Sequence, residues 1–244
     1  MTESLLHQHQ AVWNKKPVLR EIYRAWYRMI MAHMIAGKTL EIGAGSGNFK
    51  EFAPETLSSD IVWLPWLDLT LDAHALPFKD QVFSNIVLFD VLHHLENPMF
   101  FFTEAIRALK EGGRLILMEP YVSPASFIVY RFFHPEPLVT TQDPFAIKPR
   151  EVDRKPFDAN QAIPTLMLIR AQNRFQSRFP ALQFKAIKKY SFFAYPLSGG
   201  FDHPSLLPLW ALGPMLCVER LLSFMAPLLA FRMFAVLEKK KNPL

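Results

Sequence analysis

The segment LEIGAGSGNF, residues 40–49, places three glycines within five positions directly after an apolar run. A glycine-rich turn between a buried strand and a helix is where open α/β folds bind ligands. Gly43, Gly45 and Gly47 depart from the dinucleotide fingerprint G-x-G-x-x-G, because Asn48 takes the place of the last glycine. The lysine of the phosphate loop is also missing. The loop therefore favours a nucleoside ligand without phosphates, and a glycine turn that binds nothing is the alternative.

The rest of the chain alternates apolar runs with helical patterns. Strands are predicted at 38–45 (running into the glycine turn), 56–63, 66–72, 84–92, 114–120, 182–195 and 233–239. Helices are predicted at 17–36, from 48–52 onward, at 96–113 up to the Gly112–Gly113 pair, near 124–133 and at 161–178. Strands that alternate with helical crossovers imply a single α/β domain with a largely parallel sheet and helices on its faces.

Composition and charge exclude several classes of protein. The formal net charge of +5 is modest, and no basic stripe is interleaved with aromatic residues, so we predict no nucleic-acid partner. The single Cys217 excludes an internal disulfide and fits a reducing compartment. The first ten residues are polar and lack the apolar core of a signal peptide. We therefore expect a cytoplasmic location, with membrane association as a further possibility.

The most apolar region, 205–237, is interrupted by three prolines and three charged residues. No apolar run in it approaches the ~20 residues that a membrane span requires. We expect a buried helical pair there. Contact with a membrane surface or a dimer partner through 205–232 is the alternative.

Polar residues follow successive predicted strands. Asp60 ends the second strand, where a carboxylate can accept both hydroxyls of a ribose, and Ile61 beside it can pack on a purine. Asp72 ends the third strand and can accept from an exocyclic amine, while the backbone N–H of Ala73 can serve a ring nitrogen. The fourth strand leads into Asp90, His93 and His94. Because the carboxyl ends of parallel strands meet at one edge, these residues should lie together.

At these segments, roughly residues 38–120, the chain resembles the class I S-adenosylmethionine-dependent methyltransferases, in particular the small-molecule group often called type 11. The resemblance implies a Rossmann-like, mostly parallel seven-stranded sheet flanked by helices, with an antiparallel last strand. It implies S-adenosylmethionine as the cofactor, with its methionine part along Glu41, Gly43, Ala44, Gly45 and Gly47. Asp60 would hold the ribose, Asp72 and Ala73 the adenine, and Asp90 would sit near the sulfonium and amino group.

One spacing departs from the family pattern, because only twelve residues separate Gly47 from Asp60. The first crossover helix must be short, and Asp68 is the alternative ribose ligand. We divide the single domain, 1–244, into an N-terminal helical lid (1–36), a cofactor-binding core (37–120), an acceptor-cap insertion rich in proline and aromatic residues (121–160), and closing helices and strands (161–244). Tyr23 on the lid is a candidate cofactor contact, with ordinary packing as the alternative.

Methyl transfer from a sulfonium is an in-line displacement, so the protein mainly aligns the reactants and excludes water. A hydroxyl acceptor also gains from a general base. Candidates are His93 and His94, for which a structural role is the alternative, and His134 with Glu136 in FFHPEP (132–137), where a rigid turn is the alternative. Tyr121, and Glu119 before it, should face the same cleft, with a satisfied carboxylate near the cofactor as the alternative for Glu119. No metal-binding set is predicted.

The insertion and the region 201–234 are rich in Phe, Leu, Met and Trp and poor in charge. We therefore expect a hydrophobic small-molecule acceptor of a lipid-like, polyene, polyketide, quinone or aromatic kind, methylated on oxygen or less readily on carbon. A catalytically silent cofactor-binding subunit that supports a partner enzyme is the second hypothesis. A nicotinamide oxidoreductase is disfavoured by the glycine spacing.

Overall fold

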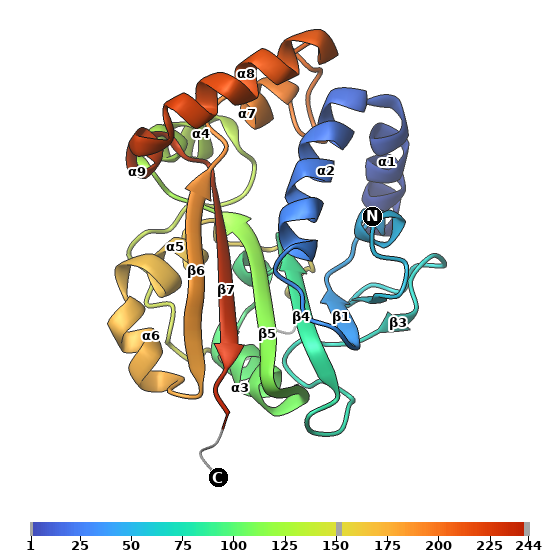
Figure 1. Cartoon of the computed structure of the whole chain (residues 1–244), viewed down its shortest axis with the longest axis vertical. Coiled ribbons are helices and arrows are strands. Elements are labelled where there is room, and N and C mark those ends of the chain that lie inside the picture. The colour runs from blue at the N-terminus through green and yellow to red at the C-terminus, as the bar shows by residue number, and fades with distance from the viewer. Residues whose placement is uncertain (1, 150–152, 242–244) are drawn as a thin grey trace.

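The computed structural model describes residues 2–149 and 153–241 and contains a seven-stranded sheet (Figure 1). Its strand order is β3-β2-β1-β4-β5-β7-β6. The strands are β1 (Thr39–Ile42), β2 (Leu57–Asp60), β3 (Leu69–Thr70), β4 (Phe83–Phe89), β5 (Leu109–Pro120), β6 (Leu182–Tyr190) and β7 (Arg232–Lys239). β7 is antiparallel to both neighbours and all other pairs are parallel. The predicted mostly parallel sheet with an antiparallel last strand is confirmed.

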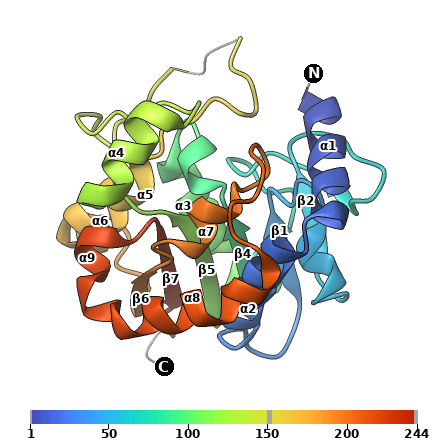
Figure 2. The ribbon, with the colours of Figure 1, turned by 90° about the horizontal axis from the view of Figure 1, so that it is seen from above.

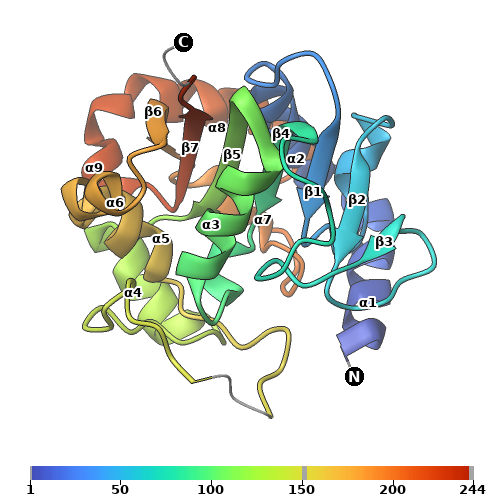
Figure 3. The same cartoon turned by 90° about the horizontal axis from the view of Figure 1, so that it is seen from below.

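Helices flank the sheet on both faces (Figures 2 and 3). The longer helices are α1 (Thr2–Lys15), α2 (Pro17–Met31), α3 (Pro98–Ala108), α4 (Pro124–Phe133), α6 (Gln172–Arg178) and α8 (Leu209–Leu221). The shorter ones are η1 (Asn48–Glu51), η2 (Leu92–His94), α5 (Ile163–Thr165), η3 (Leu166–Arg170), α7 (Ala194–Ser198), η4 (Ser223–Met225) and α9 (Ala226–Leu229). Residues 150–152 of the predicted cap and 242–244 of the tail lie outside the described residues.

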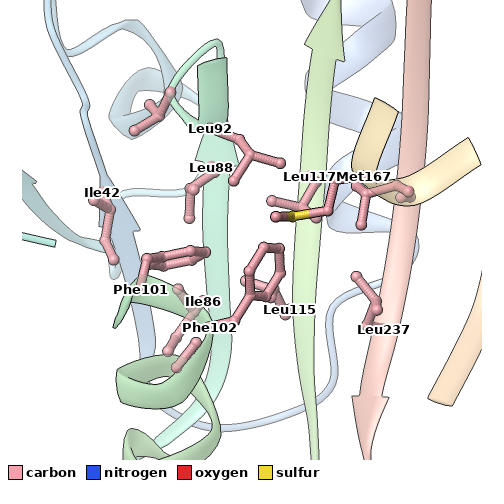
Figure 4. Close-up of a cluster of buried hydrophobic side chains, with 14 of the residues drawn as sticks. Ile42, Ile86, Leu88, Leu92, Phe101, Phe102, Leu115, Leu117, Met167 and Leu237 are labelled. Atoms are coloured by element: carbon pink, nitrogen blue, oxygen red, sulfur yellow. The ribbon is translucent and has the colours of Figure 1, made fainter. Parts of the chain in front are cut away.

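The central strands contribute to two apolar cores because side chains alternate along a strand. On one face, Ile86 and Leu88 of β4 pack with Phe101 and Phe102 of α3 (Figure 4). On the other face, Val87 of β4 belongs to the core that α1, α2 and α8 cover. A sheet buried on both faces needs nearly continuous apolar strands, which is why β4 could be predicted from its sequence.

The first crossover contains only the single turn η1, as the short spacing before Asp60 predicts. α2 begins at Pro17, as predicted, but it ends at Met31 instead of residue 36. α1 was not predicted, because its two buried apolar side chains, Leu6 and Trp13, are too sparse to give a helical pattern. It packs on α2, where the rings of Trp13 and Tyr23 lie 5.8 Å apart.

Two predicted helix boundaries are wrong. α3 ends at Ala108 and not at Gly112–Gly113, because Leu109 is already extended and pairs with Phe83 of β4. The predicted helix 161–178 is interrupted at Ala171, whose φ of −110° and ψ of 34° are not helical. The Ala171 N–H donates to the Leu166 carbonyl five residues back, which closes the wide turn η3. Sequence periodicity does not detect either local change.

The prediction of a buried helical pair in 205–237 is also wrong. In α8 only Leu212 is buried, while Trp210 and Leu221 are 82% and 78% exposed. The reason is that α8 packs on the preceding part of the fold mainly through its contacts with α2 and α7. In the described part of the chain no single helix is long and apolar enough to cross a membrane; Leu209–Leu221 and Ser223–Leu229 meet the length and composition test together, but with a 66° bend between them.

Candidate active site

A cavity of about 790 Å³ lies at the carboxyl ends of the parallel strands. Its walls come from the loop after β1, the residues that follow β2, β3 and β4, the helices α1 and α2, and segments of the predicted cap. Among the predicted site residues, all of which are described, Gly47, Tyr121 and Glu119 do not line it, and neither does Asp68, the alternative ribose ligand. The predicted gathering of strand-end residues at one sheet edge is thus present in the structure.

The glycine loop is shaped first by the protein itself. Gly43, Gly45 and Gly47 all have a left-handed backbone, with φ of 70°, 51° and 75°. A Cβ on Gly43 would lie 2.3 Å from a methyl group of Val91, and one on Gly47 would lie 2.9 Å from the ring of Trp66. At Gly43 and Gly47 it is therefore a neighbouring side chain, and not a bound ligand, that leaves no room for a larger residue.

Asp60 fastens this loop to the end of β2. Its Oδ2 accepts the Gly45 N–H at 2.9 Å and its Oδ1 accepts the Val62 N–H at 3.0 Å. Burial raises the pKa of Asp60, although these backbone hydrogen bonds oppose the shift. Asp68 instead accepts from the Ser58 N–H and pairs with Lys50, away from the cavity. Of the two candidate ribose ligands, only Asp60 lines the cavity.

The third strand end presents one engaged carboxylate and one apolar surface. Asp72 Oδ1 accepts the His74 N–H at 2.9 Å and lies 2.7 Å from Nδ1 of the same ring. Ala73 follows it in the cavity wall. Ile61, opposite in the wall, is 52% exposed, so a flat ring could pack on it. The segment thus offers polar and apolar contacts side by side.

Glu41 is a buried carboxyl group beside the glycine loop. It is 3% exposed, and its Oε2 has no hydrogen-bond partner among the described residues. Burial, together with the nearby charge of Asp60, raises the pKa of Glu41 to about 8. A buried polar atom without a partner is costly, so this atom is placed to receive a ligand donor.

Asp90 forms a buried ion pair with Arg232, the first residue of β7. Arg232 Nη2 donates to Asp90 Oδ2 at 2.6 Å. The guanidinium lies over the rings of Trp26, Phe89 and Tyr195, with 5.1, 5.4 and 5.5 Å to the ring centroids. Burial raises the pKa of Asp90, against the lowering effect of Arg232. Asp90 Oδ1 has no partner within the described ranges, so it too is open to a ligand.

His93 is held between two carboxylates. Its Nδ1 lies 2.7 Å from Oε2 of the buried Glu119, and its Nε2 lies 3.5 Å from Glu136 Oε2. Burial would lower the pKa of His93, but the two carboxylates raise it to about 10. In turn, burial opposes ionisation of Glu136, yet His93 lowers the pKa of Glu136 to about 2. His93 is therefore a cation and a poor general base.

His94 and His134 are two neutral histidines that line the cavity. Burial, with the adjacent charge of His93, lowers the pKa of His94 to about 4. Burial also lowers the pKa of His134, which follows α4. His134 Nδ1 accepts the Glu136 N–H at 3.2 Å, so the proton of the neutral ring sits on Nε2. That geometry makes the free nitrogen of His134 a hydrogen-bond donor.

Tyr121 was expected to face the cleft, and the structure places it elsewhere. Its N–H donates to the Phe231 carbonyl, which continues the pairing of β5 with β7. Its hydroxyl approaches the Pro227 carbonyl of α9 at 3.5 Å, and the Lys189 ammonium lies 4.9 Å from its ring centroid. The chain has passed the sheet edge at this point, so the ring packs under α9 and is no candidate base.

Comparison with known proteins adds independent information on this site. Residues 40–117, which include the glycine loop and the ends of β2 and β4, match a family model described as a methyltransferase domain. An uncharacterized protein of Methanocaldococcus jannaschii is 31% identical over 109 residues, covering 39% of this chain and 51% of that protein. The aligned part thus spans about half the length of this curated relative.

Solved structures with the same fold include two S-adenosylmethionine-dependent methyltransferases. One, from Archaeoglobus fulgidus, has a TM-score of 0.53 and 15% identity, covering 91% of this chain and 94% of that one. The other, from Thermotoga maritima, has a TM-score of 0.56 and 17% identity, covering 96% and 99%. At such low identity the likeness concerns the fold alone. Residues 40–117 thus match a methyltransferase domain, and the whole chain shares its fold with S-adenosylmethionine-dependent methyltransferases.

The lining of the cavity suits S-adenosylmethionine. S-adenosylmethionine carries an ammonium and a sulfonium, and the wall beside the glycine loop contains two carboxyl oxygens without partners, Glu41 Oε2 and Asp90 Oδ1. Gly43, Ala44 and Gly45 line the cavity between the ends of β1 and β2. The residues present therefore fit a cationic nucleoside without phosphates.

Other residues that line the cavity were not predicted. Arg232 interrupts the apolar run FRMFAVL (231–237), and a charge inside a strand that is otherwise apolar could have signalled a buried partner. Leu6 and His9 of α1 and Tyr195 of α7 line the cavity as well, without any sequence signal that we can name.

Proposed function

We propose that this methyltransferase transfers a methyl group from S-adenosylmethionine to an oxygen atom of a hydrophobic small molecule. The observation that carries the proposal is the continuity of one cavity from the glycine loop to the aromatic cap. Tyr130, Phe133 and Phe157 of the cap, with Phe201 and Phe231, line the same cavity as Gly43. Tyr130 directs its hydroxyl to the Phe231 carbonyl at 2.6 Å, so mainly its ring is left for the cavity.

Bound S-adenosylmethionine supplies a methyl group already activated on a sulfonium. What the chain contributes is alignment and exclusion of water, which can supply roughly 7–11 kcal/mol of the barrier. The aromatic cap orients an apolar body, and His134 Nε2 is placed to donate a hydrogen bond to the acceptor oxygen. An O-methylated product fits this donor better than a methylated carbon, which has no lone pair to accept it.

An exposed apolar face adjoins the aromatic cap. We define the apolar face as the exposed side chains of α4, α8, η4 and the segments beside them: Phe127, Ile128, Phe132, Phe133, Leu206, Leu209, Trp210, Leu221, Phe224 and Leu228. α4 packs against α9, and Figure 2 shows α4, α9 and α8 following one another. Phe133 belongs both to the face and to the cavity wall.

We infer that the apolar face rests on a membrane surface and lets a lipid-like acceptor reach the cavity. Large exposed apolar patches mark interaction sites, and aromatic residues such as Trp210 favour the membrane interface. The positive net charge of the chain is the sign that an anionic lipid surface attracts. A dimer contact through the same residues is the competing explanation.

The test is transfer of an isotope-labelled methyl group. The protein, labelled S-adenosylmethionine and a panel of apolar phenols, quinols and long-chain acids are incubated, extracted into organic solvent and analysed by mass. We expect label in an ether or ester, and base hydrolysis then distinguishes the two. Gly45→Val, which puts a branched residue at a φ of 51°, is the control that should lose cofactor binding.

A catalytically silent subunit remains the alternative, because the apolar face could equally hold a partner enzyme. Calorimetry with S-adenosylmethionine and S-adenosylhomocysteine separates the two. Tight binding without labelled product from the panel or from a lipid extract would favour the silent subunit. Labelled product attached to nitrogen or carbon would contradict the proposed O-methylation.

A further inference from the structure

We propose that His93, His94 and Glu136 bind one divalent transition-metal ion on the acceptor side of the cavity. The sequence predicted no metal ligands, because Glu136 follows the two histidines by more than forty residues. The fold brings the three side chains together. Each offers a ligand atom, and these atoms all lie within 4.8 Å of one another.

The spacing of these side-chain atoms is compatible with three ligands of one ion. His93 Nε2 lies 3.5 Å from Glu136 Oε2, and His94 Nε2 lies 3.8 Å from Glu136 Oε1. Good hydrogen bonds between such atoms are shorter, about 2.7–3.2 Å. Metal–ligand bonds of about 2.0–2.2 Å in tetrahedral geometry separate neighbouring ligand atoms by roughly 3.4 Å. Small side-chain movements would therefore complete the coordination.

The surroundings fix the ligands as a metal site requires. Glu119 Oε1 accepts the N–H groups of Val91 and Leu92 at 2.9 and 2.7 Å, which holds its Oε2 against His93 Nδ1. A metal-binding histidine commonly gives its second ring nitrogen to a carboxylate in this way, since the contact sets the tautomer and the ring orientation. His93 Nε2 is thereby turned toward Glu136.

Residues 154–161, at the end of the cap, hold Glu136 and the backbone of both histidines. Gln161 Nε2 donates to Glu136 Oε2, and the Asn160 N–H donates to the His93 carbonyl at 2.9 Å. Arg154 Nη2 donates a hydrogen bond to the His94 carbonyl at 2.8 Å. Nδ1 of His94 is buried and has no hydrogen-bond partner in the described part of the chain. The backbone of His94 is thus held, while one nitrogen of its ring is unsatisfied.

The ligand types select the metal. Two imidazoles and one carboxylate suit Zn²⁺, Fe²⁺, Co²⁺ or Ni²⁺, whereas Mg²⁺ and Ca²⁺ prefer oxygen ligands throughout. Three protein ligands leave a fourth position open, as in catalytic zinc sites. All three ligands line the cavity that contains the glycine loop, so the open position is available to an acceptor molecule.

The role that we assign to the ion rests on the proposed O-methylation. A hydroxyl on a divalent ion loses its proton more readily, as water does when its pKa falls from 15.7 to about 7 on zinc. The proton leaves to solvent. An oxygen lone pair then forms the O–CH₃ bond, and the C–S bond breaks with its electron pair remaining on sulfur. The products are the methyl ether or ester and S-adenosylhomocysteine.

The test uses the untagged full chain, stripped with a chelator and titrated with Co²⁺ as a spectroscopic probe, with Zn²⁺ in competition. We expect one equivalent to bind with the visible spectrum of a four-coordinate site. Glu136→Gln and His94→Asn should each weaken Co²⁺ binding at least tenfold. Glu119→Gln should weaken it about 10–100-fold, as a positioning residue would. His203→Asn, a cavity histidine outside the cluster, is the matched control.

Calorimetric titration with S-adenosylmethionine on the same samples keeps this inference separate from the proposed function. The stripped parent protein and the stripped variants should bind S-adenosylmethionine with the same affinity. Unchanged binding by the variants also shows that they are folded. No Co²⁺ spectrum, or Co²⁺ affinity unaffected by Glu136→Gln and His94→Asn, would overturn the metal site. Undiminished methyl transfer by stripped protein would overturn the role of the ion, while metal binding without any methyl transfer would count against the proposed function alone.

Discussion

Arg232 Nη2 lies 2.6 Å from Asp90 Oδ2, which joins the first residue of β7 to the residue after β4 across the intervening β5. The pair sits where the cofactor cavity meets a group of aromatic rings. Arg232 is nearly inaccessible, whereas the side chain of Asp90 is 29% exposed toward the cavity. The pair therefore couples the stability of the sheet edge to the shape of the site.

Removing the cation of this pair should destabilise the protein. Arg232→Leu leaves the Asp90 carboxylate facing aromatic rings, and we expect a loss of about 3 kcal/mol, the low end for a buried pair because Asp90 is partly exposed. Urea unfolding measures this change. Arg24→Leu, which breaks the exposed pair with Glu21, should cost less than about 1 kcal/mol. Equal losses in the two variants would contradict the structural role of Arg232.

Gly43 should be required for folding because of its neighbour. In Gly43→Ala the new Cβ meets Val91 at 2.3 Å, and the left-handed backbone adds about 1–2 kcal/mol of strain. The double variant Gly43→Ala with Val91→Ala removes the clash but keeps the strain. We expect thermal unfolding to show the double variant as more stable than Gly43→Ala alone. A double variant that is no more stable would mean that Val91 does not limit the residue at position 43.

Glu41 should make stability fall as pH rises. The pKa of Glu41 is about 8 in the folded protein, against 4.5 for an ordinary glutamate, so between these values the unfolded chain ionises Glu41 and the folded chain does not. The native state loses roughly 1.4 kcal/mol per pH unit from this group across that window. Glu41→Gln should therefore be more stable than the parent at pH 8, and the difference should vanish near pH 4.5.

The measurement is thermal unfolding of both proteins from pH 4.5 to 8.5. Parallel curves would contradict a buried neutral Glu41.

His134 should act as a hydrogen-bond donor. His134→Gln keeps a donor and should lower kcat less than tenfold with unchanged cofactor affinity, whereas His134→Phe should lower it further. A general base would contribute about 10²–10⁴-fold, so equal losses of that size in both variants would assign His134 that role instead. Steady-state kinetics with the acceptor found by the labelling experiment decides this.

The apolar face should bind vesicles that contain anionic lipid. Replacing both Trp210 and Phe224 by Glu should abolish cosedimentation with them, because two charges then face the lipid. Trp63→Glu is the matched control, since Trp63 is 66% exposed but belongs to the loop after β2. Unchanged cosedimentation would contradict the membrane surface. A dimer in size-exclusion chromatography that the double variant dissolves would favour a protein partner.

Sequence alone determined the strands and strand-end residues that line the glycine-loop side of the cavity. β1, β4 and the glycine loop, with Asp60, Asp72 and Asp90 at the strand ends, are encoded by local patterns that survive in the fold. They are local because a strand, its turn and the next residue are fixed within a few positions of the chain.

Only the tertiary structure decided the rest. Arg232 meets Asp90 from 142 positions away, and Glu136 reaches His93 through a cap that has little regular structure. The same holds for Tyr121, which the pairing of β5 with β7 turns away from the cavity, and for α8, whose apolar side chains stay exposed. Such outcomes depend on which distant segments pack together, and no periodicity in a single chain reports a contact of that kind.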